Sequence, residues 1–256
     1  WYLVEWRDFD GAWQRDAFDR QGRIAALVEA VQQRGLEVWP GMRFFQGYGS
    51  TEAGQATVLR PADHLSARRQ RTGAPMLMVE LRVVDETMQD LPAGSIGELL
   101  IRSRQLMRCY HGKPELSAEV LVGGWYRTRD AAWFDEDGYM TIAGRVDDMI
   151  VTGGENVFPR EVEEALLQHS AVSDASVFGG PDADGVRAVC AAGVLKPGAA
   201  SLDPATIDEA ALVEFCRARL ASYKKPKRIL FLGEIPKTVI GKPDRKALVA
   251  MLAPGR

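Results

Sequence analysis

The stretch "GRVDDMIVTGGENVFPREVE", residues 144–163, decides how the chain divides. It begins with charged residues, passes a glycine pair and ends in a helical pattern that starts at Pro159, a residue suited to the first turn of a helix. Strand patterns dominate before it, and helix and strand patterns alternate after it. We therefore place a domain boundary at Gly144–Asp147, between a first part, 1–144, and a second part, 145–256.

The second part reads as a small α+β domain. Its length is typical of one compact domain. Helices are expected where apolar residues recur every three to four positions, and strands where short apolar runs end in glycine or charged residues. The predicted helices are 159–169, 208–221 and 244–252, and the predicted strands are 174–180, 187–195 and 228–233.

The first part is predicted to be rich in β-structure. "MRFFQ" reads as a strand that enters a turn at "GYGSTE", and an Asp-Gly pair between alternating apolar residues indicates a hairpin. A small barrel or a twisted sheet is expected, preceded by an amphipathic helix, while the first 17 residues stay unassigned. The predicted elements are the helix 19–35 and the strand segments 42–46, 76–85, 97–103 and 132–144.

Composition narrows the class of protein. Of the 256 residues, 46% are hydrophobic and 26% are charged, as in ordinary globular proteins, and the net charge of -3 provides no basic surface for nucleic acid. No apolar run approaches the length of a membrane span. The three cysteines are too widely spaced to indicate a disulfide framework or a zinc site. We expect a cytoplasmic protein without a signal peptide, and the first residue, Trp1, suggests a piece of a longer chain.

The stretch "QGYGSTE", residues 46–52, combines groups typical of a nucleotide and metal site. Glycines allow close backbone approach, a tyrosine ring offers a flat face to a base, hydroxyls suit phosphate, and a carboxylate suits Mg²⁺. A glycine- and serine-rich loop with a chance glutamate is the alternative. The candidate residues are Gly47, Tyr48, Gly49, Ser50, Thr51 and Glu52.

Three charged residues further along the chain fit the same chemistry. Asp130 ends "YRTRD" and has a carboxylate able to accept hydrogen bonds from both ribose hydroxyls. Arg145 suits ribose or phosphate oxygens. Lys242 follows a glycine in "IPKTVIGKPDR", residues 235–245, where a solvated turn lysine is the alternative reading.

In this order, the stretches resemble the adenylate-forming (AMP-binding) enzymes, which include acyl-CoA synthetases, peptide-synthetase adenylation domains and luciferases. The resemblance covers about residues 41–250 and is most specific over residues 144–163. It implies a mixed α/β and α+β fold: the end of a large adenylation domain with a β-rich subdomain, followed by a small, mobile α+β lid domain.

The resemblance also implies roles for the first group of candidates. Tyr48 would stack near adenine, and Asp130 would hold the ribose. Thr51 would touch phosphate, Glu52 would hold Mg²⁺, and Arg145 would support the nucleotide.

The remaining implied roles concern movement of the lid. Lys242 would reach the carboxylate substrate and the α-phosphate, where its charge offsets negative charge that develops in the transition state. Asp147 would be the hinge. After adenylation the lid would turn and bring the Gly153–Asn156 loop, with Gly153, Gly154 and Glu155, to the acyl-adenylate, leaving room for the CoA thiol.

The expected function is that of an ATP-dependent carboxylic acid:CoA ligase for a fatty or related acyl acid, with ATP, Mg²⁺ and coenzyme A. The phosphate-gripping loop of the family and most of its acyl pocket lie upstream of the Tyr48 stretch and are not visible, so we expect the carboxy-terminal portion of a longer enzyme. Alternatives are a catalytically inactive remnant without that loop, and an acyl-AMP ligase or peptide-synthetase adenylation domain.

This chain departs from the family pattern at several positions. Arg129 occupies the glycine position of Y-x-T-G-D, and is expected to add bulk and charge beside the ribose site. Ser103, Arg104 and Cys109 stand where Gly, Pro and Gly are usual. These changes favour the hypothesis of a truncated, drifting gene copy.

Overall fold

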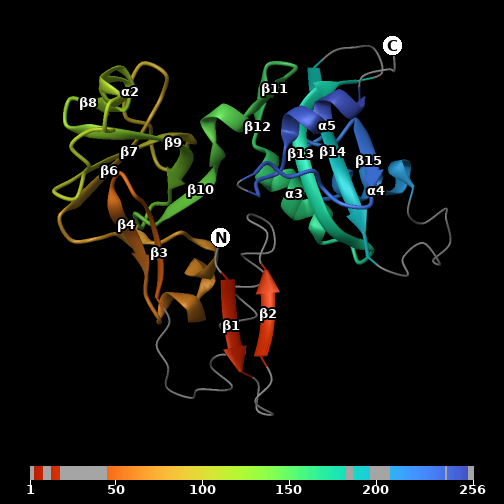
Figure 1. The fold of residues 1–256 in the computed structure, drawn as a ribbon, viewed down its shortest axis with the longest axis horizontal. Coiled ribbons are helices and arrows are strands. Elements are labelled where there is room, and N and C mark those ends of the chain that lie inside the picture. The colour runs from red at the N-terminus through yellow and green to blue at the C-terminus, as the bar shows by residue number, and fades with distance from the viewer. Residues whose placement is uncertain are drawn as a thin grey trace. The chain divides into compact units, whose positions relative to one another are not determined.

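The structure is a computed structural model that describes residues 3–7, 13–17, 45–182, 187–196, 208–239 and 241–252 (Figure 1). The chain divides between Asp147 and Asp148 into two compact units. One unit is Gln32–Asp147, which we call the amino-terminal unit. The other comprises Trp1–Val31 and Asp148–Arg256, and we call its Asp148–Arg256 part the carboxy-terminal unit. Strands β1 (Leu3–Arg7) and β2 (Trp13–Ala17) pair antiparallel in a two-stranded sheet of their own.

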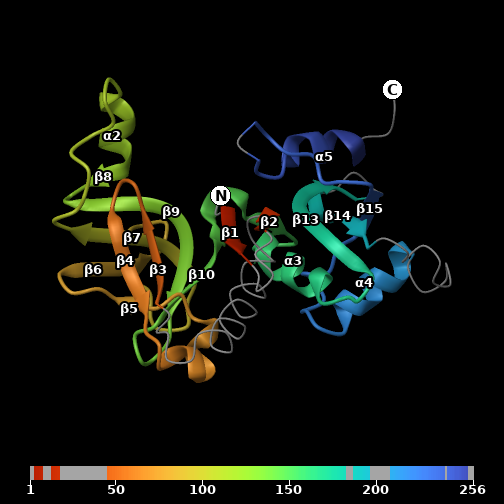
Figure 2. The ribbon, with the colours of Figure 1, turned by 60° about the horizontal axis from the view of Figure 1, so that its bottom comes forward.

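The main sheet of the amino-terminal unit has five strands in the order β10-β9-β7-β6, with β8 paired to β9, and every pairing is antiparallel. Helix α2 (Pro114–Val120) leads directly into β8 (Figure 2). The strands are β6 (Val79–Val84), β7 (Gly97–Ser103), β8 (Leu121–Val122), β9 (Trp125–Phe134) and β10 (Met140–Arg145).

A second, three-stranded sheet of the same unit has the order β3-β4-β5 and is also antiparallel. Its strands are β3 (Gln46–Ser50), β4 (Gly54–Leu59) and β5 (Ala74–Pro75). Two short 3-10 helices, η1 (Asp63–Leu65) and η2 (Ala67–Gln70), lie between β4 and β5 in the chain.

The two sheets share one apolar core. Leu99 and Ile101 of β7 and Met140 of β10 are fully buried, and they cluster with Ala56 of β4 and with Ala53 in the turn between β3 and β4. Burying side chains of the size of leucine stabilises a fold by about 1.5–3 kcal/mol each. This core therefore holds the β3–β4 hairpin, with the candidate nucleotide residues, against the main sheet.

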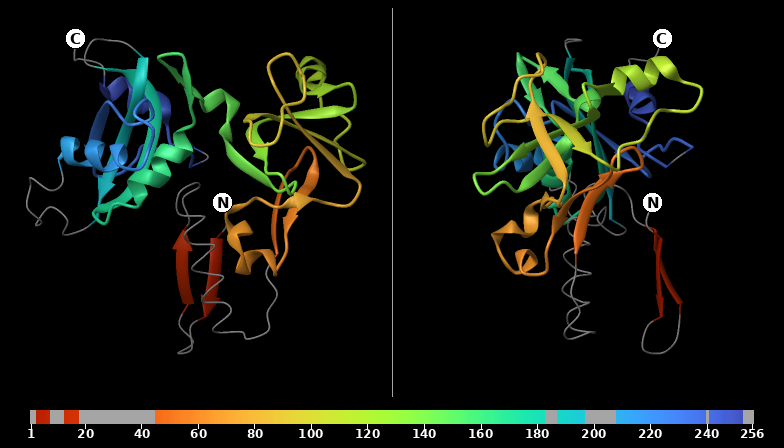
Figure 3. Two further views of the ribbon diagram at one scale, coloured as in Figure 1. Left: turned by 180° about the vertical axis from the view of Figure 1, so that it is seen from behind. Right: turned by 90° about the vertical axis from the view of Figure 1, so that its left-hand side faces the viewer.

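The carboxy-terminal unit is built on a three-stranded sheet with the order β13-β14-β15. The first pair is antiparallel and the second is parallel. A short hairpin opens the unit, and β11 lies beside β14 (Figure 3). The strands are β11 (Ile150–Thr152), β12 (Glu155–Val157), β13 (Val172–Pro181), β14 (Arg187–Leu195) and β15 (Arg228–Leu232).

Helices cover both faces of this sheet (Figure 2). Side chains alternate across a strand, so Val177 packs with the helices α3 and α4 on one face while its neighbour Phe178 packs with α5 on the other. Cys190 lies on the Phe178 face. The helices are α3 (Pro159–Leu167), α4 (Glu209–Arg217) and α5 (Arg245–Leu252).

Much of the sequence prediction is confirmed. The fold is mixed, as expected, and β7 and β14 coincide with the predicted strands 97–103 and 187–195. Helix α3 begins at Pro159 as predicted, and the Asp137-Gly138 pair lies between β9 and β10. Helix α4 ends at Arg217 instead of residue 221.

Three predictions were wrong or incomplete. "QGYGS" is a strand and not a turn, since it pairs with β4 along its whole length, and the turn comes at 51–53. The main sheet shows open ends at β10 and β6 and is not a barrel. Helix α2 and the β11–β12 hairpin were not anticipated. The predicted helix 19–35 and most of the strand 42–46 lie outside the described residues.

None of the helices within the described residues has the length and apolar character needed to span a bilayer.

Candidate functional site

A bulge in β9 shapes the first cluster of candidate residues. Glu98 pairs with Ala131 and Leu100 pairs with Arg127, so the three residues Thr128–Asp130 lie opposite Leu99 alone. Thr128 Oγ1 donates a 2.8 Å hydrogen bond to the Leu99 carbonyl and accepts one of 2.9 Å from the Asp130 amide. Bulges redirect side chains in this way and are frequent beside active sites.

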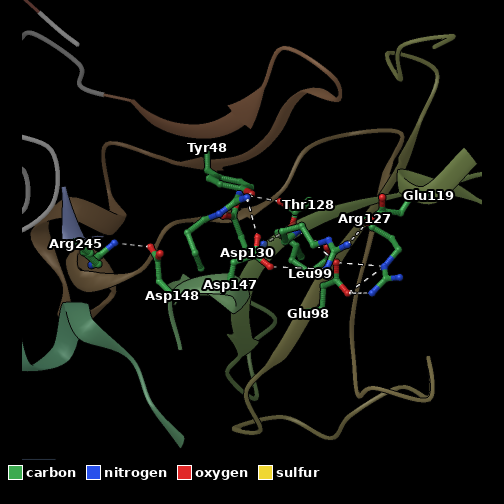
Figure 4. A network of polar contacts seen from close by, with 12 residues as sticks. Tyr48, Glu98, Leu99, Glu119, Arg127, Thr128, Asp130, Asp147, Asp148 and Arg245 are labelled. Carbon is green, nitrogen blue, oxygen red and sulfur yellow. Dashed lines mark hydrogen bonds and ion pairs between the residues drawn. The ribbon is translucent and has the colours of Figure 1, made fainter. Parts of the chain in front are cut away.

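The bulge presents Asp130 to Tyr48, as Figure 4 shows, and also to Arg145. The Tyr48 hydroxyl donates a hydrogen bond to Asp130 Oδ2, and Arg145 Nη1 lies 2.8 Å from Oδ1. Arg145 Nη1 also donates to the Thr128 carbonyl at 2.9 Å. The structure thus brings together three predicted nucleotide-binding residues from β3, β9 and β10.

Burial and the neighbouring Asp130 carboxylate raise the pKa of Tyr48 well above its usual value of 10. The hydroxyl therefore stays protonated and acts as a donor to Asp130. Two donors hold the carboxylate, each on a different oxygen, which fixes its plane. Such a fixed carboxylate, with lone pairs remaining on both oxygens, suits the paired hydroxyls of a ribose.

Glu52 lies in a second cluster, which also contains two tyrosines that the sequence did not single out. The Tyr110 hydroxyl donates to Glu52 Oε1 at 2.9 Å. Tyr126 is buried, and burial together with the Glu52 charge raises its pKa. Burial raises the pKa of Tyr110 as well, with the hydrogen bond to Glu52 as the next cause. Both tyrosines are thus uncharged at neutral pH, and Tyr110 is a donor to the carboxylate.

The other residues of the "QGYGSTE" stretch have more local roles. Thr51 is exposed at the turn, and Ser50 Oγ accepts a hydrogen bond from the Ala53 amide at 3.2 Å. A Cβ at Gly49 would lie 2.2 Å from the Gly54 carbonyl oxygen, and one at Gly47 would lie 1.7 Å from the Gln55 side chain. The backbone of the partner strand β4 is therefore sufficient reason for glycine at position 49, whereas at position 47 the flexible Gln55 side chain could move aside.

Asp147, the predicted hinge, is exposed and lies between two arginines of its own unit. Its carboxylate is 3.8 Å from Arg129 Nη1 and 3.9 Å from Arg145 Nη2. Arg129 also pairs with Glu119 on α2. Arg129 has a φ of +60°, a left-handed conformation that favours glycine. The sequence predicted an effect of its bulk and charge. The structure shows in addition that the backbone at this position is strained for any residue with a Cβ.

Gly153 and Gly154 form the two-residue turn between β11 and β12 in the carboxy-terminal unit. Their φ values of +59° and +83° fit a hairpin turn that requires positive φ at both positions. Glu155 and Asn156, the first two residues of β12, are both exposed, and a Cβ at either glycine would meet open space. Backbone conformation, not crowding, therefore calls for glycine in this structure.

Lys242 is exposed in a second turn of the carboxy-terminal unit. Its carbonyl accepts a 2.8 Å hydrogen bond from the Thr238 amide, and its amide donates to Thr238 Oγ1 at 3.3 Å. Gly241, with a φ of +72°, closes the turn through a 2.7 Å bond to the Thr238 carbonyl. Hydrogen bonds thus hold the backbone of the turn, and the side chain of Lys242 is exposed to solvent.

The chemical types of these side chains suit a nucleotide and its magnesium ion. Among the described residues no group of three or more Asp, Glu, His or Cys side chains could enclose a metal ion. Mg²⁺ bound with nucleotides takes one or two carboxylates and completes its shell with phosphates and water. Glu52, with one oxygen held by Tyr110, is a suitable single carboxylate ligand.

Two family models match the chain. The model for the AMP-binding enzyme matches residues 24–111, and the model for the AMP-binding enzyme C-terminal domain matches residues 161–242. The chain belongs to the AMP-binding enzyme family. A long-chain-fatty-acid–CoA ligase of Salmonella typhimurium is 36% identical over 221 residues, an alignment covering 85% of this chain and 38% of the ligase.

Solved structures of two other synthetases have a similar fold. The amide bond synthetase McbA from Marinactinospora thermotolerans has a TM-score of 0.75 at 35% identity, over 90% of this chain and 45% of that chain. The o-succinylbenzoate CoA synthetase MenE from Bacillus subtilis, in complex with its acyl-adenylate intermediate, has a TM-score of 0.74 at 28% identity, over 88% and 43%. The chain therefore spans less than half the length of these relatives.

Proposed function

We propose that this chain is part of an ATP-dependent carboxylic acid:CoA ligase, which forms an acyl-adenylate and then an acyl-CoA thioester. This part would contain the residues that bind the ribose and the metal ion, together with the lysine that acts in adenylation. The observation that carries the proposal is the arrangement of Tyr48, Asp130 and Arg145, with both carboxylate oxygens of Asp130 held by donors. Family membership supports it, as does the relationship to a fatty-acid–CoA ligase.

The amino-terminal unit would bind and orient the nucleotide. Asp130 accepts hydrogen bonds from the ribose hydroxyls, and the Tyr48 ring lies next to it for contact with the base. Arg145 adds a positive charge at the same place. Glu52 would supply one oxygen to Mg²⁺, which when bound neutralises phosphate charge, and the exposed Thr51 hydroxyl would touch phosphate.

The carboxy-terminal unit would supply groups for two half-reactions. The exposed ammonium of Lys242 would offset the negative charge that builds up when the acyl carboxylate attacks the α-phosphate. The glycine turn of β11–β12 would line the path of the CoA thiol. Asp147 would be the hinge about which the carboxy-terminal unit turns between the two half-reactions. We place the substrate among fatty or related acyl acids.

A second product class has a specific observation in its favour. McbA, an amide bond synthetase, is among the structures to which this chain is similar. An amide-forming enzyme would make the same acyl-adenylate and then transfer the acyl group to an amine instead of a thiol.

Product analysis distinguishes these possibilities. The chain is incubated with ATP, Mg²⁺ and a panel of fatty and aryl acids, with CoA in one set and a panel of amines in the other, and products are identified by mass spectrometry. Acyl-CoA in the first set is the expected result. Amides in the second set without acyl-CoA in the first would replace the proposal, and the absence of every acyl product from folded protein would refute it for this chain.

A further inference from the structure

Arg245, the first residue of α5, connects three segments of the carboxy-terminal unit. Figure 4 shows its ion pair with Asp148. Its Nη1 lies 2.7 Å from Asp148 Oδ2 at the start of the unit. Its Nη2 lies 3.4 Å from Glu163 Oε1 on α3, and its Nε donates a 2.9 Å hydrogen bond to the Val177 carbonyl on β13. Each of the three guanidinium nitrogens thus contacts an oxygen of a different segment.

This cluster is more enclosed than a surface ion pair. The Glu163 side chain is only 6% exposed and the Arg245 side chain 24%, whereas the partners of the Arg217–Glu214 pair on α4 are 61% and 67% exposed. Exposed pairs contribute little and are readily exchanged for water. Breaking an enclosed pair leaves a charge without its partner, so loss of the Arg245–Glu163 contact costs more free energy than loss of an exposed pair. The Asp148 side chain, at 34% exposed, lies between these two cases.

The same residue lies just after the turn that carries Lys242. The Asp244 amide donates a 2.7 Å hydrogen bond to the Pro236 carbonyl, and Asp244 Oδ1 accepts one of 3.1 Å from the Ala247 amide as the cap of α5. Pro243, which lies between Lys242 and Asp244, has a fixed φ. The backbone between Lys242 and Arg245 therefore has little freedom to absorb a displacement of either residue.

We propose that Arg245 is a positioning residue for Lys242, because it ties the lysine-bearing turn to Asp148, the residue next to the expected hinge. Among the three contacts of Arg245, the ion pair with Asp148 is the one that links the lysine-bearing turn to the first residue of the unit. This inference rests on the proposed function for the role of Lys242, but the mechanical link itself can be tested without activity.

Hydrogen exchange tests the link in the chain as it stands. In Arg245→Met and, separately, in Asp148→Asn, the amides of residues 238–242 are expected to exchange about tenfold faster, the size of coupling typical of contacting residues. Amides of β13 and β14 are expected to keep their protection, which shows that the unit is still folded. Arg217→Met, which removes the exposed pair on α4, is the matched control. Unchanged exchange at 238–242 in both test variants would overturn the proposal, as would equal acceleration throughout the unit.

A double-mutant cycle tests the consequence for chemistry. Arg245→Met is expected to slow acyl-adenylate formation about tenfold in the parent chain, but to have no further effect in a Lys242→Ala background. Equal effects in both backgrounds would show that Arg245 does not act through Lys242. If the parent chain forms no acyl-adenylate at all, the proposed function fails, and the exchange experiment alone decides whether Arg245 holds the turn.

Discussion

Asp147 and Asp148 are adjacent in the chain, yet their carboxylates are held in different units. Asp147 lies 3.8–3.9 Å from Arg129 and Arg145 in the amino-terminal unit, whereas Asp148 pairs at 2.7 Å with Arg245 in the carboxy-terminal unit. Each unit therefore anchors its own side of the boundary. The hinge at Asp147 stays a prediction, and the boundary between the two units follows this residue directly.

The first prediction concerns nucleotide affinity. Asp130→Asn removes the charge that Tyr48 and Arg145 orient, and puts an amide donor where ribose hydroxyls need an acceptor, so the affinity for ATP should fall about tenfold or more. Tyr48→Phe keeps the aromatic ring and the carboxylate, and should change affinity less than about threefold. Isothermal titration calorimetry measures both. Equal affinity of Asp130→Asn and the parent chain would remove Asp130 from the site.

The second prediction concerns the backbone of Arg129. Replacement by glycine or by alanine removes the same ion pair with Glu119, but only glycine tolerates the φ of +60° without strain. Arg129→Gly should therefore be more stable than Arg129→Ala by about 1 kcal/mol, the cost of a left-handed conformation for a residue with a Cβ. Urea denaturation of the two variants gives the difference. An alanine variant as stable as the glycine variant would show that the bulge adjusts without strain.

The third prediction concerns pH. Burial raises the pKa of Glu163 above its ordinary value of 4.5, although the Arg245 charge opposes the shift. A folded state that holds its proton more tightly is favoured at low pH, so this contribution is fully present below about pH 4.5 and is lost as the pH rises through the folded pKa.

Comparison with Glu163→Gln isolates that contribution. Glutamine keeps an oxygen that can accept the 2.8 Å hydrogen bond from the Val177 amide but does not titrate. The free energy of unfolding of the parent chain, relative to the variant, should decline from pH 4.5 to pH 7.5. A relative stability that rises over this range would mean that the attraction of Arg245 outweighs burial.

The fourth prediction concerns magnesium. Glu52→Gln removes the proposed ligand charge and should raise the Mg²⁺ concentration needed for half-maximal enhancement of ATP binding about tenfold. Tyr110→Phe removes only the 2.9 Å hydrogen bond that orients the carboxylate, and should have a smaller effect in the same direction. Titration of Mg²⁺ at fixed ATP, starting from EDTA-treated protein, compares the variants. Identical magnesium curves for Glu52→Gln and the parent would exclude Glu52 as a ligand.

Sequence patterns predicted the elements whose causes are local. Helix α3 follows from a helix-compatible proline at its first position and an apolar stripe, and β14 from a continuous apolar run between charged residues. Strand β3 was mistaken for a turn because its two glycines imitate turn chemistry. Only the pairing with β4 shows why glycine is needed there, since a Cβ at Gly49 would meet the opposing backbone.

The candidate site could be predicted only in part, because local motifs do not record contacts between residues far apart in the sequence. Asp130 was found from its motif, but the bulge that aims it depends on the register of β9 against β7, which no local pattern records. Tyr110 reaches Glu52 across 58 residues, and Arg245 reaches Asp148 across 97. Contacts at such separations follow from the packed fold, so sequence motifs could point to candidate residues but not to the side chains that support them.

Acid-dependent exchange of pyrophosphate into ATP tests the central claim most directly, because it measures adenylation alone. With an acid from the active panel, the parent chain and a Lys227→Ala control, which removes another exposed lysine of the same unit, should catalyse exchange. Lys242→Ala should lose it by about a hundredfold, as expected for removal of a group that stabilises transition-state charge. Exchange by Lys242→Ala at the rate of the parent, or no acid-dependent exchange by the folded parent chain, would contradict the account.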